Sequence, residues 1–339
     1  MRNDTRKLFE AYCAALAQLN GVDPGTRSFT VEPSVQQTLE TRMQESSAFL
    51  GSINMIGVSQ QAGEKIGLGI GGPIAGTTDT NTADRQTSDP TNFDKHGYFC
   101  SQTNFDTHLR YTKLDAWRHF PDFQTRIRDL ILRRQALDRI MIGFNGVSRA
   151  ATSDKVANPM LQDVNVGWLQ KYRQHAPSRV MAEVVESSGQ VTYGEGGDYA
   201  NLDALVYDAI NNLIEPWYQE DTELVAICGR ALLHDKYFPL VNQEQPASEK
   251  LATDIIISQK RIGGLPAVRV PYFPATAVMV TRLDNLSIYW QEGTRRRTVT
   301  DNAKRDRVEN YESDNEAYVV EDYGCGCMVE NITPAPVNP

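Results

Sequence analysis

Three glycines early in the chain have the spacing of a dinucleotide-binding loop. Gly67, Gly69 and Gly72 fit the pattern G-x-G-x-x-G, whose chemistry needs a helix N-terminus directly behind the last glycine to hold a pyrophosphate. Residues 73–79 follow with the sequence PIAGTTD, which lacks the apolar period of a helix. We therefore expect no cofactor here. A cytosolic α/β enzyme with a Gly-rich nucleotide loop stays open as the alternative.

The thiols and imidazoles do not form a recognisable catalytic or metal-binding motif. Cys325 and Cys327 stand close together, but no second cysteine pair or histidine accompanies them, as a zinc site would need. The other members are scattered along the chain: Cys13, Cys100, Cys228, His96, His108, His119, His175 and His234. Walker, GxSxG, HExxH and EF-hand motifs are absent from the sequence. These observations predict no catalytic, cofactor-binding or metal-binding residues, and so no enzyme.

Composition narrows the class of protein further. A chain of 339 residues with 40% hydrophobic residues predicts two domains, or one domain with large excursions. A net charge of −9 argues against a surface that wraps nucleic-acid phosphates. No apolar run reaches the length of about 18 residues that predicts a membrane helix, and the N-terminus lacks the apolar core of a signal peptide. We expect a cytoplasmic product with no membrane partner.

The strongest periodic signal, over residues 122–146, predicts one long helix, which we call the spine helix. Its apolar residues recur at steps of three and four and draw one stripe. They are Phe123, Ile127, Leu130, Ile131, Leu137, Ile140, Met141 and Phe144. Asp122 is a favourable N-cap residue, and Asn145-Gly146 predicts a left-handed stop. Because different patterns lie on either side, the helix is expected to link two regions.

The first 60 residues are predicted to be two loosely attached helical pieces. Leu8, Tyr12, Leu16 and Leu19 share one face of a helix within residues 1–29, and a polar linker, 21–28, follows it. Such a helix needs a partner, because an isolated helix of roughly 15 residues is marginal in water. It could instead fold back on the main body. The next helix, opened by Pro33-Ser34, has sparse apolar residues and is expected to be a lightly attached arm.

Residues 61–112 predict an extended hairpin that projects from the body. In its first strand Ile66, Leu68 and Ile70 alternate with Gly67, Gly69 and Gly71, so one face is apolar and the other is bare. The return strand is expected at Asn104–Tyr111. Between them, residues 72–96 are a polar stretch of a length that is uncommon in a compact monomer. We expect this hairpin to contact something outside its own subunit.

The C-terminal half has an α/β pattern. Helices are predicted at 202–213 and 230–240, and strands at 223–228, 255–258, 267–270, 278–280 and 286–290. Charged strands follow from 306 to 332, and the Pro-rich tail, 333–339, is predicted to be disordered. An acidic chain with these projecting parts and no active site favours a structural assembly protein. An enzyme and a binding module are the two alternatives.

The order of these parts resembles the major capsid protein of tailed bacteriophages with the Hong Kong 97 phage fold, an α+β fold. The closer resemblance is to the peduovirus, or P-two-like, type. It rests on long stretches that cover nearly the whole chain, with the hairpin tip, residues 187–195 and the tail as departures. The stretches are residues 29–39, 43–47, 122–129, 143–147, 158–173, 196–206, 211–221, 235–242, 257–274, 306–313 and 318–323.

The resemblance implies a domain plan. Residues 1–29 would be a propeptide-like helix that contacts a scaffold, 30–60 the N-terminal arm, and 61–112 the extended hairpin. Residues 113–199 would form the spine helix and peripheral domain. The axial domain would follow at 200–292, then the return strands of the peripheral domain at 293–332 and the tail at 333–339.

The resemblance also implies partners and processing. Subunits would form hexamers and pentamers that close an icosahedral shell around double-stranded DNA, which they touch without sequence specificity. An internal scaffolding protein with protease activity and a portal protein would be the other partners. The protease would remove the N-terminal segment near Phe29-Thr30. The protein would be assembled in the host cytoplasm and end in the virion.

Overall fold

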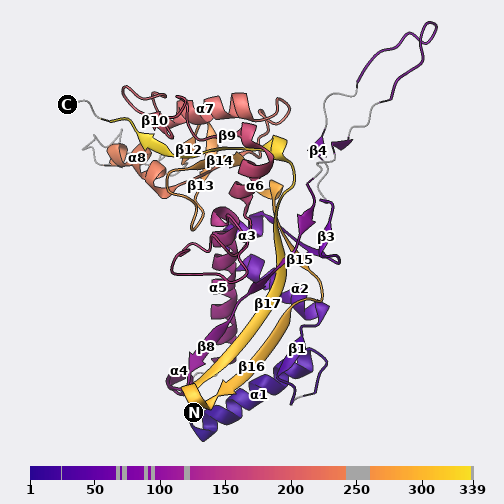
Figure 1. Cartoon of the computed structure of the whole chain (residues 1–339), viewed down its shortest axis with the longest axis vertical. Helices are drawn as coiled ribbons and strands as arrows, with labels where there is room; N and C mark the ends of the chain where they lie inside the picture. Colours follow the sequence, from indigo (N-terminus) through magenta and orange to yellow (C-terminus); the bar gives the residue numbers. More distant parts are fainter. Residues whose placement is uncertain are drawn as a thin grey trace, which may run out of the picture.

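A computed structural model describes residues 1–23, 25–65, 69–70, 75–87, 91–92, 96–117, 123–241 and 260–336. The molecule is elongated (Figure 1). Helix α5 (Phe123–Asn145) runs alongside the long strand β17 (Arg307–Val320) through its middle. A six-stranded sheet with two helices lies at one end, and helix α1 (Asn3–Leu19) lies at the other.

The seven-stranded sheet is built from three distant parts of the chain. Its order is β1-β16-β17-β15-β2, and off this path β7 pairs with Ser313–Glu316 and β8 with Arg307–Asn310 of β17. The strands are β1 (Ser28–Thr30), β2 (Asn54–Val58), β7 (Ser101–Asn104), β8 (Thr107–Arg110), β15 (Leu286–Gln291) and β16 (Arg296–Asn302). In register, Thr298 of β16 lies opposite Tyr311 of β17, and Ile288 of β15 lies opposite Tyr318. Backbone hydrogen bonds therefore join strands from the first 60 residues to strands from the last 60 in one sheet.

The six-stranded sheet, of order β12-β13-β11-β14-β18-β9, is covered by α7 (Leu202–Leu213) and lies beside α8 (Arg230–Val241). Its strands are β9 (Val180–Met181), β11 (Val225–Cys228), β12 (Arg261–Ile262), β13 (Leu265–Val268), β14 (Val278–Thr281) and β18 (Cys327–Val329). Asn201 caps α7 by accepting from the Ala204 amide at 2.9 Å. The helix predicted at 202–213 is confirmed, because its apolar stripe, including the buried Leu205 and Ile210, packs on this sheet.

Several short elements connect these parts. They are α2 (Pro33–Glu45), α3 (Ala48–Ser52), α4 (Tyr111–Trp117), α6 (Trp168–His175), β3 (Ala62–Gly63), β4 (Gly69–Ile70), β5 (Thr91–Asn92), β6 (Tyr98–Phe99), β10 (Val191–Tyr193) and β19 (Ile332–Pro334). Four 3-10 turns lie at Pro177–Arg179, Leu283–Asn285, Ala303–Arg305 and Tyr323–Cys325. Within the described ranges, no helix is both long and apolar enough to cross a lipid bilayer.

The largest core cluster surrounds the C-terminal half of α5. Trp168 is fully buried there, and its ring lies edge-on to Phe144 and Tyr318 at 5.1 and 5.4 Å between centroids. The indole N–H donates to the Ser287 carbonyl at 3.0 Å, so the only polar atom of the side chain is satisfied. Gly143 allows this contact, because a Cβ there would lie 2.2 Å from the Trp168 ring.

The buried face of α5 differs from the predicted stripe. Ile127, Ile140, Met141 and Phe144 are buried, and Ile131 and Leu137 are half-buried. The prediction for Leu130 is wrong, because its side chain is 57% exposed while Leu132 is buried. The buried face of α5 therefore differs from the predicted apolar stripe, because two polar residues, Gln135 and Arg139, occupy buried positions on it. The side chain of Phe123 and the whole of Asp122 lie outside the described residues.

The end of α5 is also achieved differently from the prediction. Neither Asn145 nor Gly146 has a positive φ, so the left-handed stop is wrong. Glycine is required at 146 because a Cβ would lie 2.1 Å from the Asn165 carbonyl oxygen. The chain leaves the helix by a close backbone crossing.

The hairpin covers a shorter range of residues than predicted. Ala62–Gly63 pairs with Tyr98–Phe99, and Gly69–Ile70 pairs with Thr91–Asn92. The return strand predicted at 104–111 is wrong, because β7 and β8 pair with β17 of the main sheet instead. The alternation of apolar and polar residues in 104–111 reflects packing against the main body and not against the other strand of the hairpin. Of the predicted hairpin residues, Ile66, Gly67, Leu68 and Gly71 lie outside the described residues.

Three further expectations are corrected. The predicted tail is ordered at its start, where Thr333 and Pro334 pair with Thr192 and Tyr193. The strand at 286–290 belongs to the seven-stranded sheet, whereas β18 returns to the six-stranded one. Sheet membership therefore does not follow the continuous ranges 200–292 and 293–332. The strand predicted at 255–258 lies outside the described residues.

Candidate assembly surfaces

Buried ion pairs hold the arm helix α2 against the spine helix α5. The expectation of a lightly attached arm is therefore wrong. Both terminal nitrogens of the Arg139 guanidinium, Nη1 and Nη2, donate to the Glu40 carboxylate on α2. Glu40 also accepts a hydrogen bond from Arg295 at 2.6 Å. Arg139 reaches on to Glu316 of β17 at 2.8 Å. All of these side chains are at most 4% exposed. The arm, the spine helix and the main sheet therefore meet in one ionic cluster.

The cluster contains more negative than positive charge. Its guanidinium groups are Arg139 and Arg295, and its carboxylates are Glu40, Glu312, Asp314 and Glu316. Gln36 and Gln135 add hydrogen bonds to Asp314 and Glu312 at 3.3 and 3.1 Å. Two cations face four anions, and one oxygen of Asp314 has no hydrogen-bond partner. Such an excess is costly in a buried site.

Proton uptake relieves this excess. Burial, helped by the neighbouring Glu40 and Glu316, raises the pKa of Asp314 to about 8 against the opposing pull of Arg295 and Arg139. Burial also raises the pKa of Glu316 in spite of Arg139. At Glu312 burial acts in the same direction, but Arg295, Arg297 and Gln135 together outweigh it and the pKa ends below its usual value. We infer that near neutral pH the cluster holds a proton in the region of Asp314.

The N-terminal helix α1 lies on the body and does not stand free. Thr5 donates to the Asp115 carboxylate at 2.6 Å, and Arg6 lies 3.7 Å from Asp301. Its buried residues, Thr5, Phe9, Cys13 and Ala17, recur every four positions. The predicted face is wrong, because Leu8 and Leu19 are 40% and 65% exposed. The alternative of a helix folded back on the main body is the one observed.

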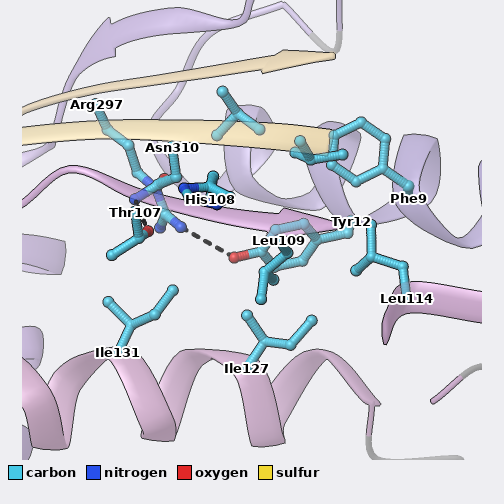
Figure 2. A pocket seen from close by; sticks show the side chains of 12 residues that line it. Phe9, Tyr12, Thr107, His108, Leu109, Leu114, Ile127, Ile131, Arg297 and Asn310 are labelled. Carbon is cyan, nitrogen blue, oxygen red and sulfur yellow. Dashed lines mark hydrogen bonds between the residues drawn. The ribbon is translucent and has the colours of Figure 1, made fainter. Parts of the chain in front are cut away.

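A small apolar cavity of about 40 Å³ lies beneath this helix. Figure 2 shows Ile127 and Ile131 rising from α5 on one side and Phe9 and Tyr12 coming from α1 on the other. The Arg297 guanidinium closes one end by donating to the Tyr12 hydroxyl at 3.1 Å. The cavity is a packing space of this contact and is too small for a cofactor.

The predicted processing site lies in a short edge strand. Phe29 and Thr30 belong to β1, where Phe29 lies opposite Arg297 and Thr30 opposite Arg296. Thr30 is exposed and Phe29 is half-buried. The residues on either side extend the pairing, since the Val31 amide donates to the Arg295 carbonyl at 2.8 Å.

The cysteine thiols are buried and unreactive. All five are free and buried. Burial raises the pKa of Cys100, Cys228, Cys325 and Cys327 to about 12, so these thiols stay protonated at neutral pH. Among the described residues, no group of three His, Cys, Asp or Glu side chains could hold a metal ion. Gly69 of the Gly-rich motif lies in strand β4, and the next element among the described residues is strand β5.

Sequence reasoning missed the ionic cluster altogether. Glu40, Arg295 and Glu316 resemble surface residues, because each lies in a polar stretch. Arg139 stands beside the apolar residues 140–142, but a single arginine there gives no sign of its partners. One signal was available: Gln36, Glu40 and Met43 share a helix face that is polar where a core-facing helix is usually apolar. The partners of Gln36 and Glu40 lie 99 to 278 residues away, so no local pattern could have identified them.

Comparisons with known proteins bear on the whole chain. The family described as phage major capsid protein, P2 family, matches residues 8–332. The chain is 60% identical to the capsid protein of Escherichia phage P2, over 98% of this chain and 95% of that one. It is 41% identical to the major capsid protein of Serratia phage KSP20, over 98% of each.

Solved structures agree in fold. A chain of the satellite phage P4 procapsid that includes the size determination (Sid) protein is 56% identical, with a TM-score of 0.84 and complete coverage of both chains. A chain of an empty GTA particle capsid matches in fold alone, at 15% identity and a TM-score of 0.50 over 85% of this chain and 90% of that one. The α+β fold of Hong Kong 97-type phage capsid proteins, expected from the resemblance, is confirmed. The chain belongs to the P2 family of phage major capsid proteins.

Proposed function

We propose that this major capsid protein forms hexamers and pentamers that close an icosahedral shell around the packaged double-stranded DNA of a tailed phage. The observation that carries this proposal is the shape of the subunit. A long hairpin leaves the body, and its described tip, residues 75–87, is exposed at every position and lies far from the two sheets (Figure 1). Such an extension has no contact to make within its own chain and suits overlap with a neighbour.

We propose that the work of the chain is structural and involves no catalysis. The protonated thiols and the strand at Gly69 support this reading. The enzyme alternative would need the Gly-rich stretch to end at a helix, whereas the described elements nearest to it, β4 and β5, are strands. Contact with DNA would be non-specific, because the chain carries net charge −9 and must release its contents.

We propose that the N-terminal segment, residues 1–29, contacts an internal scaffolding protein and is removed near Phe29-Thr30 by that partner's protease. A protease needs an extended backbone, so the three residue pairs of β1 with β16 must open first. Few hydrogen bonds resist this opening. The exposed residues on the outer side of α1, Leu8 and Leu19, would be available to the scaffold. A portal protein would occupy one vertex.

Co-assembly with the scaffold tests this account. The full chain is expressed with the scaffolding protein of the same phage, and particles are separated by sedimentation. Leu8→Asp combined with Leu16→Asp should weaken co-assembly and leave the body folded. Leu130→Asp, a matched change at an exposed site on another helix, should assemble normally. Equal assembly by the double variant would refute the scaffold contact.

Intact mass of the shell subunit from mature virions tests the processing. The expected species begins near Thr30. A species that still begins at Met1 or Arg2 would contradict the proposal.

A further inference from the structure

The N-terminal segment, residues 1–29, hides an apolar surface of the body. Beneath Phe9 and Cys13 lie five side chains of the remaining chain that are each at most 8% exposed. They are Tyr111, Leu114, Ile127, Val299 and Val308, and they come from α4, α5, β16 and β17. Cutting the chain before Thr30 and losing α1 would open this group to solvent on one side. Contiguous apolar surfaces of this kind mark contact sites.

Loss of the N-terminal segment would also leave the edge of strand β16 without a partner. In the whole chain the Val299 amide donates to the Arg27 carbonyl at 2.9 Å, and Thr298 lies opposite Ser28. Without residues 28 and 29, the edge of β16 at these positions keeps backbone donors and acceptors but has no partner. A free strand edge next to an apolar patch is a template for pairing with another chain.

The charges around the patch disfavour nucleic acid as the next occupant. Asp115 would lose Thr5 and the Arg2 amide, and Asp301 would lose Arg6. Arg297 would lose only the Tyr12 hydroxyl. Arg42, Arg128 and Glu312 also line the space against α1, so the rim would carry acidic and basic side chains together. Phosphate binding requires an excess of Lys and Arg. An apolar centre with a rim of mixed charge suits a protein surface.

We propose that the N-terminal segment is a removable cover, and that after its loss a second copy of this chain binds at the edge of β16 and over the apolar patch. The inference rests on the proposed processing. In a shell built from copies of one chain, a neighbouring subunit is the nearest protein available. The cover is held by contacts of its own, so a cut near Phe29 leaves it docked until α1 dissociates. Once detached, a helix of 17 residues loses the packing that stabilises it.

A cross-linking experiment on the full chain tests the proposal. A specific protease sequence is placed across residues 25–29 so that the cut falls before Thr30 and removes Ser28 and Phe29 from the body. A photo-cross-linking side chain replaces Ile131, which is half-buried beneath the segment. Phe9→Asp loosens the cover, since Phe9 is 6% exposed. Ala11→Asp is the matched control, since Ala11 is exposed on the same helix. Phe9→Ala replaces Phe9→Asp should the latter not fold.

After cutting, the loosened variant should lose the segment and show a several-fold rise in covalent dimer. The Ala11→Asp chain should instead cross-link to its own cut segment. A cross-linker at Tyr207, which is 60% exposed on α7 at the opposite end of the molecule from α1, should not respond to cutting. Loss of the segment by mass with no dimer, or with products on DNA instead, would overturn the proposal.

The cross-link is read on assembled particles and on the unassembled chain. Failure to assemble with the scaffold would count against the proposed function alone. Normal shells without the cut-dependent dimer would count against the cover alone.

Discussion

Replacing Asp314 by asparagine should make the protein more stable at pH 8 and flatten the dependence of its stability on pH. The substitution keeps the shape of the side chain and its contact with Gln36, and it changes the cluster from two cations against four anions to two against three. Wild-type Asp314 must either hold a proton or add an unpaired negative charge in a site where it is 1% exposed.

The sign and size follow from the shift in pKa. Asp314 has a raised pKa of about 8 in the folded chain, against an ordinary value near 3.8. Between these values the folded state binds a proton that the unfolded state has released. The free energy of unfolding therefore falls as pH rises through this window, by up to about 1.4 kcal/mol per pH unit for one proton. Below the window the group is protonated in both states, and above it the loss is complete.

Urea unfolding of the unassembled chain at pH 5, 6.5 and 8 measures this slope. The Asp314→Asn variant should match the wild type most closely at pH 5 and exceed its urea midpoint at pH 8. Asp84→Asn, the same change at an exposed hairpin residue, should run parallel to the wild type. Parallel curves for Asp314→Asn, or a lower midpoint at pH 8, would refute the picture of an anionic excess.

Three further outcomes are expected. Leu132→Asp should abolish soluble protein, because a buried unpaired carboxylate costs several kcal/mol. Leu130→Asp should be tolerated, because Leu130 is exposed. Equal yields and melting temperatures for the two variants would show that the buried face of α5 is misassigned. Gly143→Ala should lower stability by about 1–3 kcal/mol although alanine favours helices, because its Cβ meets the Trp168 ring; an unchanged or raised melting temperature would contradict this. A short turn in place of residues 72–96 should give a folded chain that cannot close shells, and normal shells in electron micrographs would count against the projecting hairpin.

Local periodicity predicted those elements whose stability comes from one apolar face. The helix Leu202–Leu213 begins and ends where its stripe does, because the stripe packs on a single sheet. The long helix was found for the same reason. Its burial was misread at Leu130 because buried positions on α5 went to Gln135 and Arg139, whose partners make polar residues acceptable in a core.

Pairings between distant strands could not be predicted from local pattern. The alternation in residues 104–111 marks a strand correctly, yet it does not say that β17, some two hundred residues later, is its partner. Burial of Glu40 has the same origin, since its cations lie on α5 and next to β16. The family resemblance supplied the architecture, but the ionic cluster and the docked N-terminal helix required coordinates.

Electron microscopy of the full chain expressed with its scaffold tests the central claim most directly. The account predicts closed icosahedral shells whose hexamers and pentamers fit the elongated subunit, with the hairpin lying over a neighbour. A uniform population of monomers or dimers under the same conditions would contradict it.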